Sequence, residues 1–241
     1  MKAMQFFFIP AALLVAAGAV MPAVAGPGQA PAGQPVAMIF DEAISTNDPE
    51  MVQSIILSRV FDRYANEQRI EVSEAEIDAF VNHIEQARRT DREQRQQRLA
   101  ELEQLLQANG PELANRDELE RERSMLAELL AGPLAEDDLT PEEEVQVVEM
   151  RRAMGQAFIR QWKINRALYQ EYGGRVIFQQ GGPEPLDAYR RHLEKLRDNG
   201  VLVIRDPEVE AHFWRYFTTD SMHSFMSEAQ AAEAFRKLPW E

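Results

Sequence analysis

The stretch SEAEIDAFVNHIEQARRTDREQRQQRLAELEQLLQAN, residues 73–109, decides the fold class. Ser73 and Glu76 have the spacing of a capping box, in which each side chain accepts a hydrogen bond from the other residue's backbone N–H. Apolar residues recur at helical spacing over 77–84 and again over 99–106, whereas 88–98 is almost wholly polar. Leu102 follows Ile84 by about five helical turns and returns to its face. The pattern therefore predicts one continuous helix with a solvated middle.

Capping and terminating residues predict further helices along the chain. Asp48-Pro49 and Asp206-Pro207 each place proline directly after an N-cap. Helices are predicted over 49–69, 116–131, 141–172, 184–198 and 207–217, and from 227 onward. The 116–131 helix, with Leu119 and Leu126 on its apolar face, is expected to fold back on 99–106 as a helical hairpin.

The last third of the chain differs from the rest. Its apolar runs 176–179 and 201–204 are typical of short strands, and two alternatives stay open: a strand pair, or buried extended segments without a sheet. Of the 20 aromatic residues, 13 lie from Phe158 onward, and aromatic side chains dominate core burial. We predict a mainly α, multi-helical fold with a long helical hairpin arm and a small aromatic-rich C-terminal lobe, with or without one short strand pair.

The N-terminus predicts export. Lys2 precedes an apolar stretch over 6–20, and Ala23-Val24-Ala25 has the form of a cleavage site. Residues 1–25 are therefore expected to be a cleavable signal peptide, followed by a flexible linker over 26–37 that is rich in Pro, Gly, Ala and Gln. A retained anchor is the alternative, although the apolar stretch is shorter than the roughly 20 residues of a membrane span. We expect a periplasmic protein that is not inserted in the membrane after cleavage.

Composition and motifs exclude several function classes. The absence of cysteine among the 241 residues rules out disulfides, thiol nucleophiles and Cys-ligated metals. A net charge of −14 argues against nucleic-acid binding, because phosphate contacts need clustered Lys and Arg. The four histidines lack the spacing of a zinc-binding helix, and the glycine pairs form no phosphate-binding loop. We predict no catalytic residue, no metal ligand and no cofactor.

Two helical faces are candidates for binding other polypeptides. Unbranched methionine side chains adapt to irregular partners, which suits a surface that accepts many sequences. The candidate residues on these two faces are Ile77, Phe80, Val81, Ile84, Met150, Met154 and Phe158. The alternative is that they belong to the core, as apolar residues at helical spacing often do.

Residues 51–84, MVQSIILSRVFDRYANEQRIEVSEAEIDAFVNHI, resemble the N-terminal helical domain of the SurA-type periplasmic chaperones and foldases. In that family an apolar helix ends in an A-x-x-x-G-I-x-V-S-x-x-E-I-D passage that opens the next helix. The matching residues are Ala65, Ile70, Val72, Ser73, Glu76, Ile77 and Asp78, and Arg69 replaces the usual glycine. The resemblance covers about 35 to 50 residues and implies part of a cradle for unfolded outer-membrane proteins. The parvulin-type isomerase domain that often follows has no recognisable pattern in 110–241, so no active-site residue is transferred.

These observations predict a periplasmic, chaperone-like protein that binds unfolded or exported polypeptides, outer-membrane proteins among them, without catalysis. A helical domain is expected over 38–172 and a compact lobe over 173–241. Two alternatives stay open. One is an enzyme, a degenerate peptidyl-prolyl isomerase, and the other is an envelope scaffold whose arm pairs with another protein or with a second copy.

Overall fold

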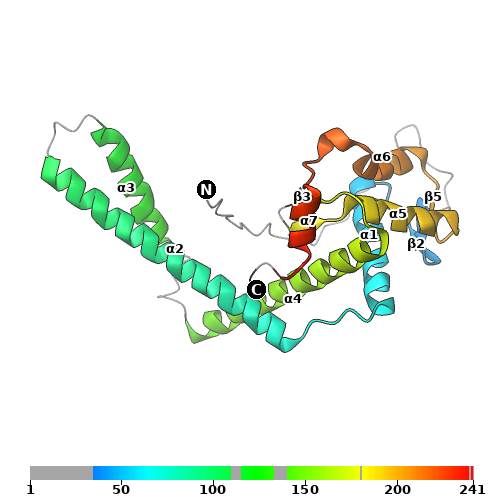
Figure 1. Cartoon of the computed structure of the whole chain (residues 1–241), viewed down its shortest axis with the longest axis horizontal. Coiled ribbons are helices and arrows are strands. Elements are labelled where there is room, and N and C mark those ends of the chain that lie inside the picture. Colours follow the sequence, from blue (N-terminus) through cyan, green and yellow to red (C-terminus); the bar gives the residue numbers. More distant parts are fainter. Residues whose placement is uncertain (1–34, 110–114, 133–139, 180, 239, 241) are drawn as a thin grey trace. The chain divides into compact units, whose positions relative to one another are not determined.

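The computed structural model describes residues 35–109, 115–132, 140–179, 181–238 and 240. Its helices are α1 (Pro49–Glu67), α2 (Glu74–Asn109), α3 (Arg116–Ala131), α4 (Pro141–Tyr172), α5 (Leu186–Asp198), α6 (Pro207–Thr218), η3 (Asp220–Met222) and α7 (Glu228–Ala234), and its strands are β1 (Ala37–Ile39), β2 (Glu42–Ile44), β3 (Ile177–Gln179), β4 (Gly182–Glu184) and β5 (Leu202–Ile204) (Figure 1). The predicted mainly α, multi-helical class is confirmed. The predicted signal peptide, 1–25, lies outside the described residues.

Side-chain caps begin α1, α2, α4, α6 and α7 at residues that the sequence indicates, whereas α3 and α5 begin without one. Asp48 Oδ1 accepts hydrogen bonds from the backbone N–H groups of Glu50 and Met51 at 3.0 and 3.3 Å. The backbone N–H of Ser73 donates to Glu76 Oε2 at 2.8 Å, and the N–H of Glu76 donates to Ser73 Oγ at 3.3 Å. The same reciprocal pair of bonds starts α4 at Thr140 and Glu143 and α7 at Ser227 and Gln230. Each cap satisfies N–H groups that a helix leaves unpaired at its first turn.

The chain divides into two compact units, and the division differs from the predicted one at residue 172. Unit 1 combines the described residues up to 71 with 158–238, and unit 2 comprises 72–157 together with Trp240. The reason is that β1 and α1 pack with elements from the last third of the chain, so the aromatic-rich segment does not form a lobe by itself. The boundary falls inside the continuous helix α4, at Phe158, where the aromatic residues of the last third begin.

Unit 1 holds a three-stranded antiparallel sheet in the order β2–β1–β5. The two-residue turn between β1 and β2 is Phe40-Asp41, whose φ angles of 53° and 64° suit the tight turns that join antiparallel strands. Val36 and Ala37 are buried beside this hairpin, so the prediction of a flexible linker over 26–37 is wrong at its C-terminal end. Residues 26–34 of that linker lie outside the described part of the chain.

The two runs predicted as strands form strands but do not pair with each other. β5 pairs with β1, with Ala37 opposite Ile204, and β3 pairs with β4, with Ile177 opposite Glu184. Each run therefore pairs with a strand that has no clear signal in the sequence.

The core of unit 1 lies between the sheet and the helices beside it. α1 buries Val52, Ile56 and Val60, and it contacts β1 and α6. α5 and α6 both contact β5, as Figure 1 shows. The rings of Phe213 and Phe217, both fully buried on α6, lie 5.5 Å apart between centroids. The aromatic residues of the last third thus contribute to burial as expected, within a core that the N-terminal elements share.

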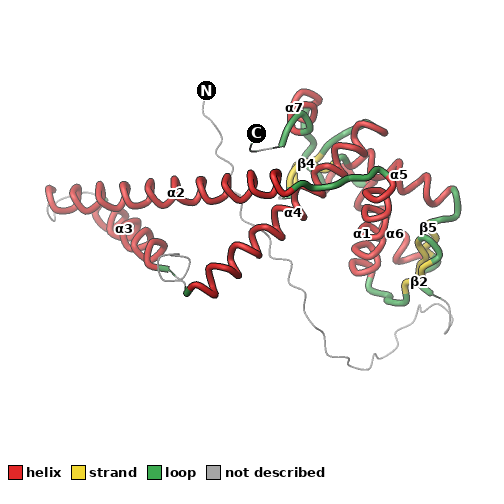
Figure 2. The backbone as a smooth tube through the Cα atoms, turned by 90° about the horizontal axis from the view of Figure 1, so that it is seen from below, coloured by secondary structure: helices red, strands yellow, loops and turns green. Residues whose placement is uncertain are grey.

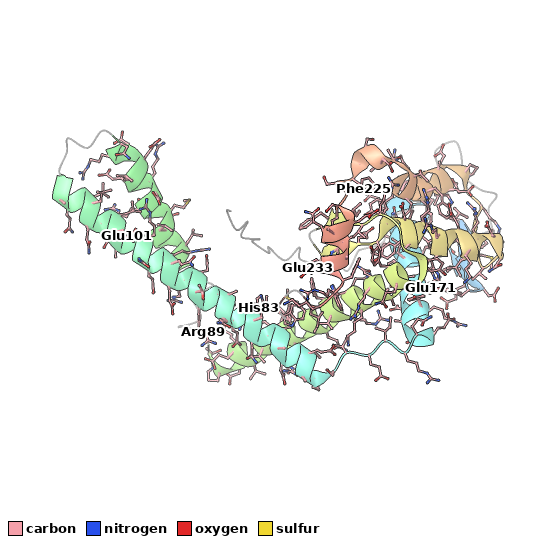
Figure 3. The ribbon with its side chains drawn as sticks, viewed as in Figure 1. His83, Arg89, Glu101, Glu171, Phe225 and Glu233 are labelled. Carbon is pink, nitrogen blue, oxygen red and sulfur yellow. The ribbon has the colours of Figure 1, made fainter. Side chains whose placement is uncertain are left out.

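Unit 2 contains the predicted helical hairpin. α3 lies along the C-terminal half of α2 (Figure 2), and Leu102, Leu106 and Leu119 are buried between them. Arg98 Nε and Nη2 donate to the carboxylate of Glu122 at 2.8 and 3.0 Å across this interface. The middle of α2, which includes Arg89 in Figure 3, is largely exposed. A continuous helix with a solvated middle is therefore confirmed.

Among the described helices none is both long and apolar enough to cross a membrane.

Candidate polypeptide-binding surface

The candidate residues on α2 are mostly buried within unit 2. Ile77, Phe80 and Val81 are each less than a tenth exposed, and Ile84 is half-buried. The ring of Phe80 stands edge-on to that of Trp240, with centroids 5.0 Å apart. It also closes on α4 at Gly155, where an added Cβ would lie 2.6 Å from Phe80 Cδ1. The structure places this face in the internal packing of the unit.

The first half of α4 is held on α2 by arginine side chains beside Gly155. Arg152 bonds to the carboxylates of Asp78, at 2.5 Å, and of Glu74. Arg151 Nη1 lies 3.5 Å from Glu85 Oε1. Hydrogen bonds to Asp78 and Glu74 raise the pKa of the Arg152 guanidinium, so it stays charged. These contacts determine which face of α4 turns toward α2.

A different face of α4 carries the methionine candidates. Met150 and Met154 are 56% and 39% exposed, whereas Phe158, the first residue of α4 in unit 1, is half-buried. At about 100° per residue, Val147, Met150 and Met154 share one face, roughly a third of a turn from Gly155. We call Val147, Met150 and Met154 the methionine stripe. Of the α4 candidates, the stripe contains the two that are accessible.

Exposed apolar side chains are concentrated in unit 2. Of the ten large apolar side chains exposed in the described residues, the seven in this unit are Leu105, Met125, Leu129, Val145, Val148, Met150 and Met154. Single exposed apolar residues are ordinary, but several on neighbouring turns of one helix indicate an interaction surface. Residues 141–150 are all exposed except Val147, which is half-buried. The opening turns of α4 thus present apolar side chains to solvent.

Leu129, Val145 and Val148 are exposed apolar residues that the sequence pattern does not mark as candidate binding residues. A signal for Leu129 is present, because α3 carries more apolar residues than a two-helix hairpin can bury: Leu119 is buried, while Met125 and Leu129 are more than half exposed. Spacing alone could not separate the buried from the exposed apolar residues, because the partner helix determines which face of a helix is covered.

The charges around the stripe favour solubility and helix formation. Glu142, Glu143 and Glu144 occupy the first turn of α4, where carboxylates interact favourably with the positive end of the helix dipole. Hydrogen bonds from the backbone and side chain of Thr140 lower the pKa of the Glu143 carboxyl. The apolar stripe therefore follows a strongly anionic helix start.

Two of the histidines, His192 and His223, have hydrogen-bond partners within unit 1. His192 Nδ1 lies 3.1 Å from the Tyr172 hydroxyl, and His223 Nε2 lies 2.6 Å from the backbone carbonyl of Tyr216. Within the described ranges, no group of three or more His, Asp or Glu side chains has an arrangement that could hold a metal ion. The accessible apolar side chains of unit 2 are suited to hydrophobic contact. No family model, curated protein or solved structure matches the chain.

Proposed function

We propose that this protein is a chaperone-type binder of unfolded or exported polypeptides that catalyses no reaction on them. The observation that supports the proposal is the exposure of Met150 and Met154 on a helix whose other face is fixed against α2. A rigid helix with flexible apolar side chains can accept different sequences, because thioether side chains repack at little cost.

The driving force for such binding is the removal of apolar surface from water. Burial contributes roughly 25 cal/mol per Å² of apolar area, and an unfolded chain supplies apolar side chains of its own to cover the stripe. The net charge of −14 gives the loaded protein a repulsive surface that opposes aggregation of the complex. Binding is therefore expected to be reversible and broad in sequence preference.

The proposal includes a periplasmic location, with unfolded outer-membrane proteins among the clients. Its support is the Ala23-Val24-Ala25 site and the resemblance of residues 51–84 to the SurA-type helical domain. Fractionation of cells that express the full chain, with N-terminal sequencing of the mature form, tests it. A mature N-terminus at Gly26 in the periplasmic fraction is expected, and retention of Lys2 in the cytoplasmic fraction would contradict it.

The binding proposal is tested by aggregation of a denatured outer-membrane protein after dilution. The mature protein is expected to suppress light scattering, and the double variant Met150→Lys with Met154→Lys is expected to require about tenfold more protein, since about 1.4 kcal/mol of binding free energy corresponds to tenfold. The matched control is Met51→Lys with Met222→Lys, which places the same charge at methionines of unit 1 that are 51% and 54% exposed. The control should act as the wild type.

Two outcomes would overturn the proposal. One is equal suppression by the stripe variant and the wild type, and the other is no suppression by the wild type. Light scattering of the protein alone distinguishes self-association: a dimer that the stripe variant dissociates would show that a second copy, rather than a client, covers the stripe. Acceleration of proline-limited refolding would contradict the absence of catalysis.

A further inference from the structure

Unit 1 contains a cavity that the proposed function does not use. Its volume is about 450 Å³, and it opens between α1, α4, the β3–β4 hairpin, α5 and α6. The polar side chains of its described lining that carry the argument are Gln161, Asn165, Gln179, Glu184, Tyr189 and Tyr216. Carboxamide groups, aromatic rings and a single carboxylate thus meet at one opening.

A first hydrogen-bond network orients the amides on α4. Asn165 Nδ2 donates to the backbone carbonyl of Pro183 at 2.9 Å, and because a carbonyl can only accept, this bond determines which end of the Asn165 amide is which. Asn165 Oδ1 then accepts from Gln161 Nε2 at 2.8 Å and from the Tyr189 hydroxyl. Gln161 Nε2 also donates to the Tyr189 hydroxyl at 2.9 Å. Both N–H groups of Gln161 are therefore used.

A second network orients the polar groups opposite. The Tyr216 hydroxyl donates to Glu184 Oε1 at 2.9 Å, and Gln179 Nε2 donates to the Tyr216 hydroxyl at 3.2 Å. A carboxylate accepts hydrogen bonds only, so the Tyr216 proton points to it and the hydroxyl oxygen is left to accept from Gln179. The amide nitrogen of Gln179 is therefore turned toward Tyr216.

In both networks N–H and O–H groups act as donors, while three acceptor oxygens in the described residues remain without a hydrogen bond. Gln161 Oε1, Gln179 Oε1 and Glu184 Oε2 make no hydrogen bond to any described residue, and none of the three belongs to the side-chain atoms that are enclosed without a partner. These oxygens therefore keep some accessible area, in residues that line the cavity. Their complement is a ligand with several N–H donors.

The charge at the cavity has no cationic side chain paired with it. Glu184 forms no ion pair within the described part of the chain, and His223 is the one basic side chain that acts on its pKa. Burial raises the pKa of the Glu184 carboxyl, while the Tyr216 hydrogen bond and His223 act in the opposite direction. A carboxylate that has lost water without gaining a cation interacts strongly with a cation that enters.

We infer that this cavity binds an ammonium or guanidinium group carried on an apolar stem. Glu184 Oε2 would accept the charged N–H group, with the free oxygens of Gln161 and Gln179 as further acceptors. Phe61 and Tyr216 also line the cavity, where aromatic rings would attract a cation, and Leu57 would give apolar contact to the stem. This chemistry belongs both to free alkyl amines and to Lys or Arg side chains of a polypeptide.

Calorimetric titration of the mature protein with n-pentylammonium and with N-pentylguanidinium, against 1-pentanol as the neutral control of similar shape, tests the inference. Either cation is expected to bind with at least tenfold preference over the alcohol, and Glu184→Gln is expected to weaken it by about tenfold. The matched control is Glu210→Gln, which neutralises an exposed carboxylate on α6 that does not line the cavity. This control should leave binding unchanged. Equal binding of cation and alcohol, no binding of either, or no effect of Glu184→Gln would overturn the inference.

A second titration separates the two sources of the cation. A short peptide with one central lysine is compared with the same peptide acetylated on that lysine, both in the Met150→Lys, Met154→Lys variant so that the methionine stripe does not contribute. Lysine-dependent binding tighter than that of the free amine identifies a polypeptide side chain, and binding of the free amine alone identifies a small amine; both support the cation site. If the Met150→Lys, Met154→Lys variant behaves as the wild type in the aggregation assay, the proposed function fails but these titrations still test the cation site. Thermal unfolding of Glu184→Gln near that of the wild type shows that the cavity is intact.

Discussion

The guanidinium of Arg175 holds the carboxylate of Asp187 with two parallel hydrogen bonds, Nε to Oδ2 at 3.0 Å and Nη2 to Oδ1 at 3.1 Å, while the backbone N–H of Arg175 donates to Oδ2 at 2.9 Å. Arg175 Nη1 also donates to Asp220 at 2.7 Å, and the guanidinium lies 4.3 Å from the ring centroid of Phe225, labelled in Figure 3. One side chain thus joins the residues before β3 to α5, η3 and the segment after it.

We predict that Asp187→Asn destabilises unit 1 by about 1–3 kcal/mol, because charged hydrogen bonds to a nearly buried carboxylate are lost. The Asp187 side chain is 9% exposed, whereas Asp198, paired with Arg197, is 66% exposed. Asp198→Asn is therefore the matched control, with an expected loss of less than about 0.5 kcal/mol. Urea unfolding measures both, and equal midpoints for the two variants would contradict the assigned role of Arg175.

Gly174 is required beside the same carboxylate for steric reasons. Its φ is +97°, and an added Cβ would lie 2.5 Å from Asp187 Cβ. Gly173, with φ +61°, has no atom within 4 Å of its added Cβ. We expect Gly174→Ala to lower the thermal midpoint clearly more than Gly173→Ala, which pays only the left-handed backbone cost of about 1–2 kcal/mol. Similar midpoints would show that the segment shifts away from Asp187 without penalty.

The helix starts could be predicted from the sequence because capping is local. Ser73 with Glu76 and Asp48 with Pro49 carry their signal within four residues, and the structure reproduces both. The β1–β2 hairpin was missed because three-residue strands show too little alternation and its turn, Phe40-Asp41, contains no glycine. The pairing of β5 with β1 joins segments some 160 residues apart, so no local pattern indicates it.

The candidate surface could be predicted only in part, for a related reason. Phe80 and Met150 both lie on apolar stripes of helical spacing, yet Phe80 is 8% exposed and Met150 is 56% exposed. The difference arises because Gly155 lets α4 approach the Phe80 ring closely, a contact between helices that are far apart in sequence. The cavity at Glu184 is lined by residues from six helices and strands, so spacing gives no signal for it.

His192 is predicted to make unit 1 sensitive to mild acid. Burial lowers the pKa of His192. The nearby charge of Lys195 lowers it further, and the carboxylates Glu171 and Glu67 raise it only in part. The unfolded state, with a pKa of about 6.5, therefore binds a proton that the folded state does not, and stability is lost as the pH falls below that value. Urea unfolding between pH 7.5 and about 5 should show this slope in the wild type and a smaller one in His192→Gln.

Comparing the wild type with His192→Gln separates the pH dependence due to His192 from that due to the carboxyl groups. Burial raises the pKa of Asp187, but the hydrogen bonds and charge of Arg175 together lower it below its usual value. That group therefore costs stability only as the pH falls below 3.8. The pKa of Glu184 is raised, so its contribution is lost as the pH rises above its usual 4.5, in the opposite direction. Both effects cancel in the difference between wild type and variant. An unchanged slope in His192→Gln would contradict the role given to this residue.

Leu102 is predicted to hold the α2–α3 hairpin independently of unit 1. Its side chain is fully buried against α3, so Leu102→Ala leaves a cavity and should cost about 2–5 kcal/mol of local stability. Leu105, three residues later and 40% exposed, is the matched control, with an expected cost below about 1 kcal/mol for Leu105→Ala. Hydrogen exchange reports the result: amides of α3 and of the C-terminal half of α2 should exchange faster in Leu102→Ala, while those of α1 and α6 keep their protection. Faster exchange in α1 and α6 as well would show that the two units unfold together.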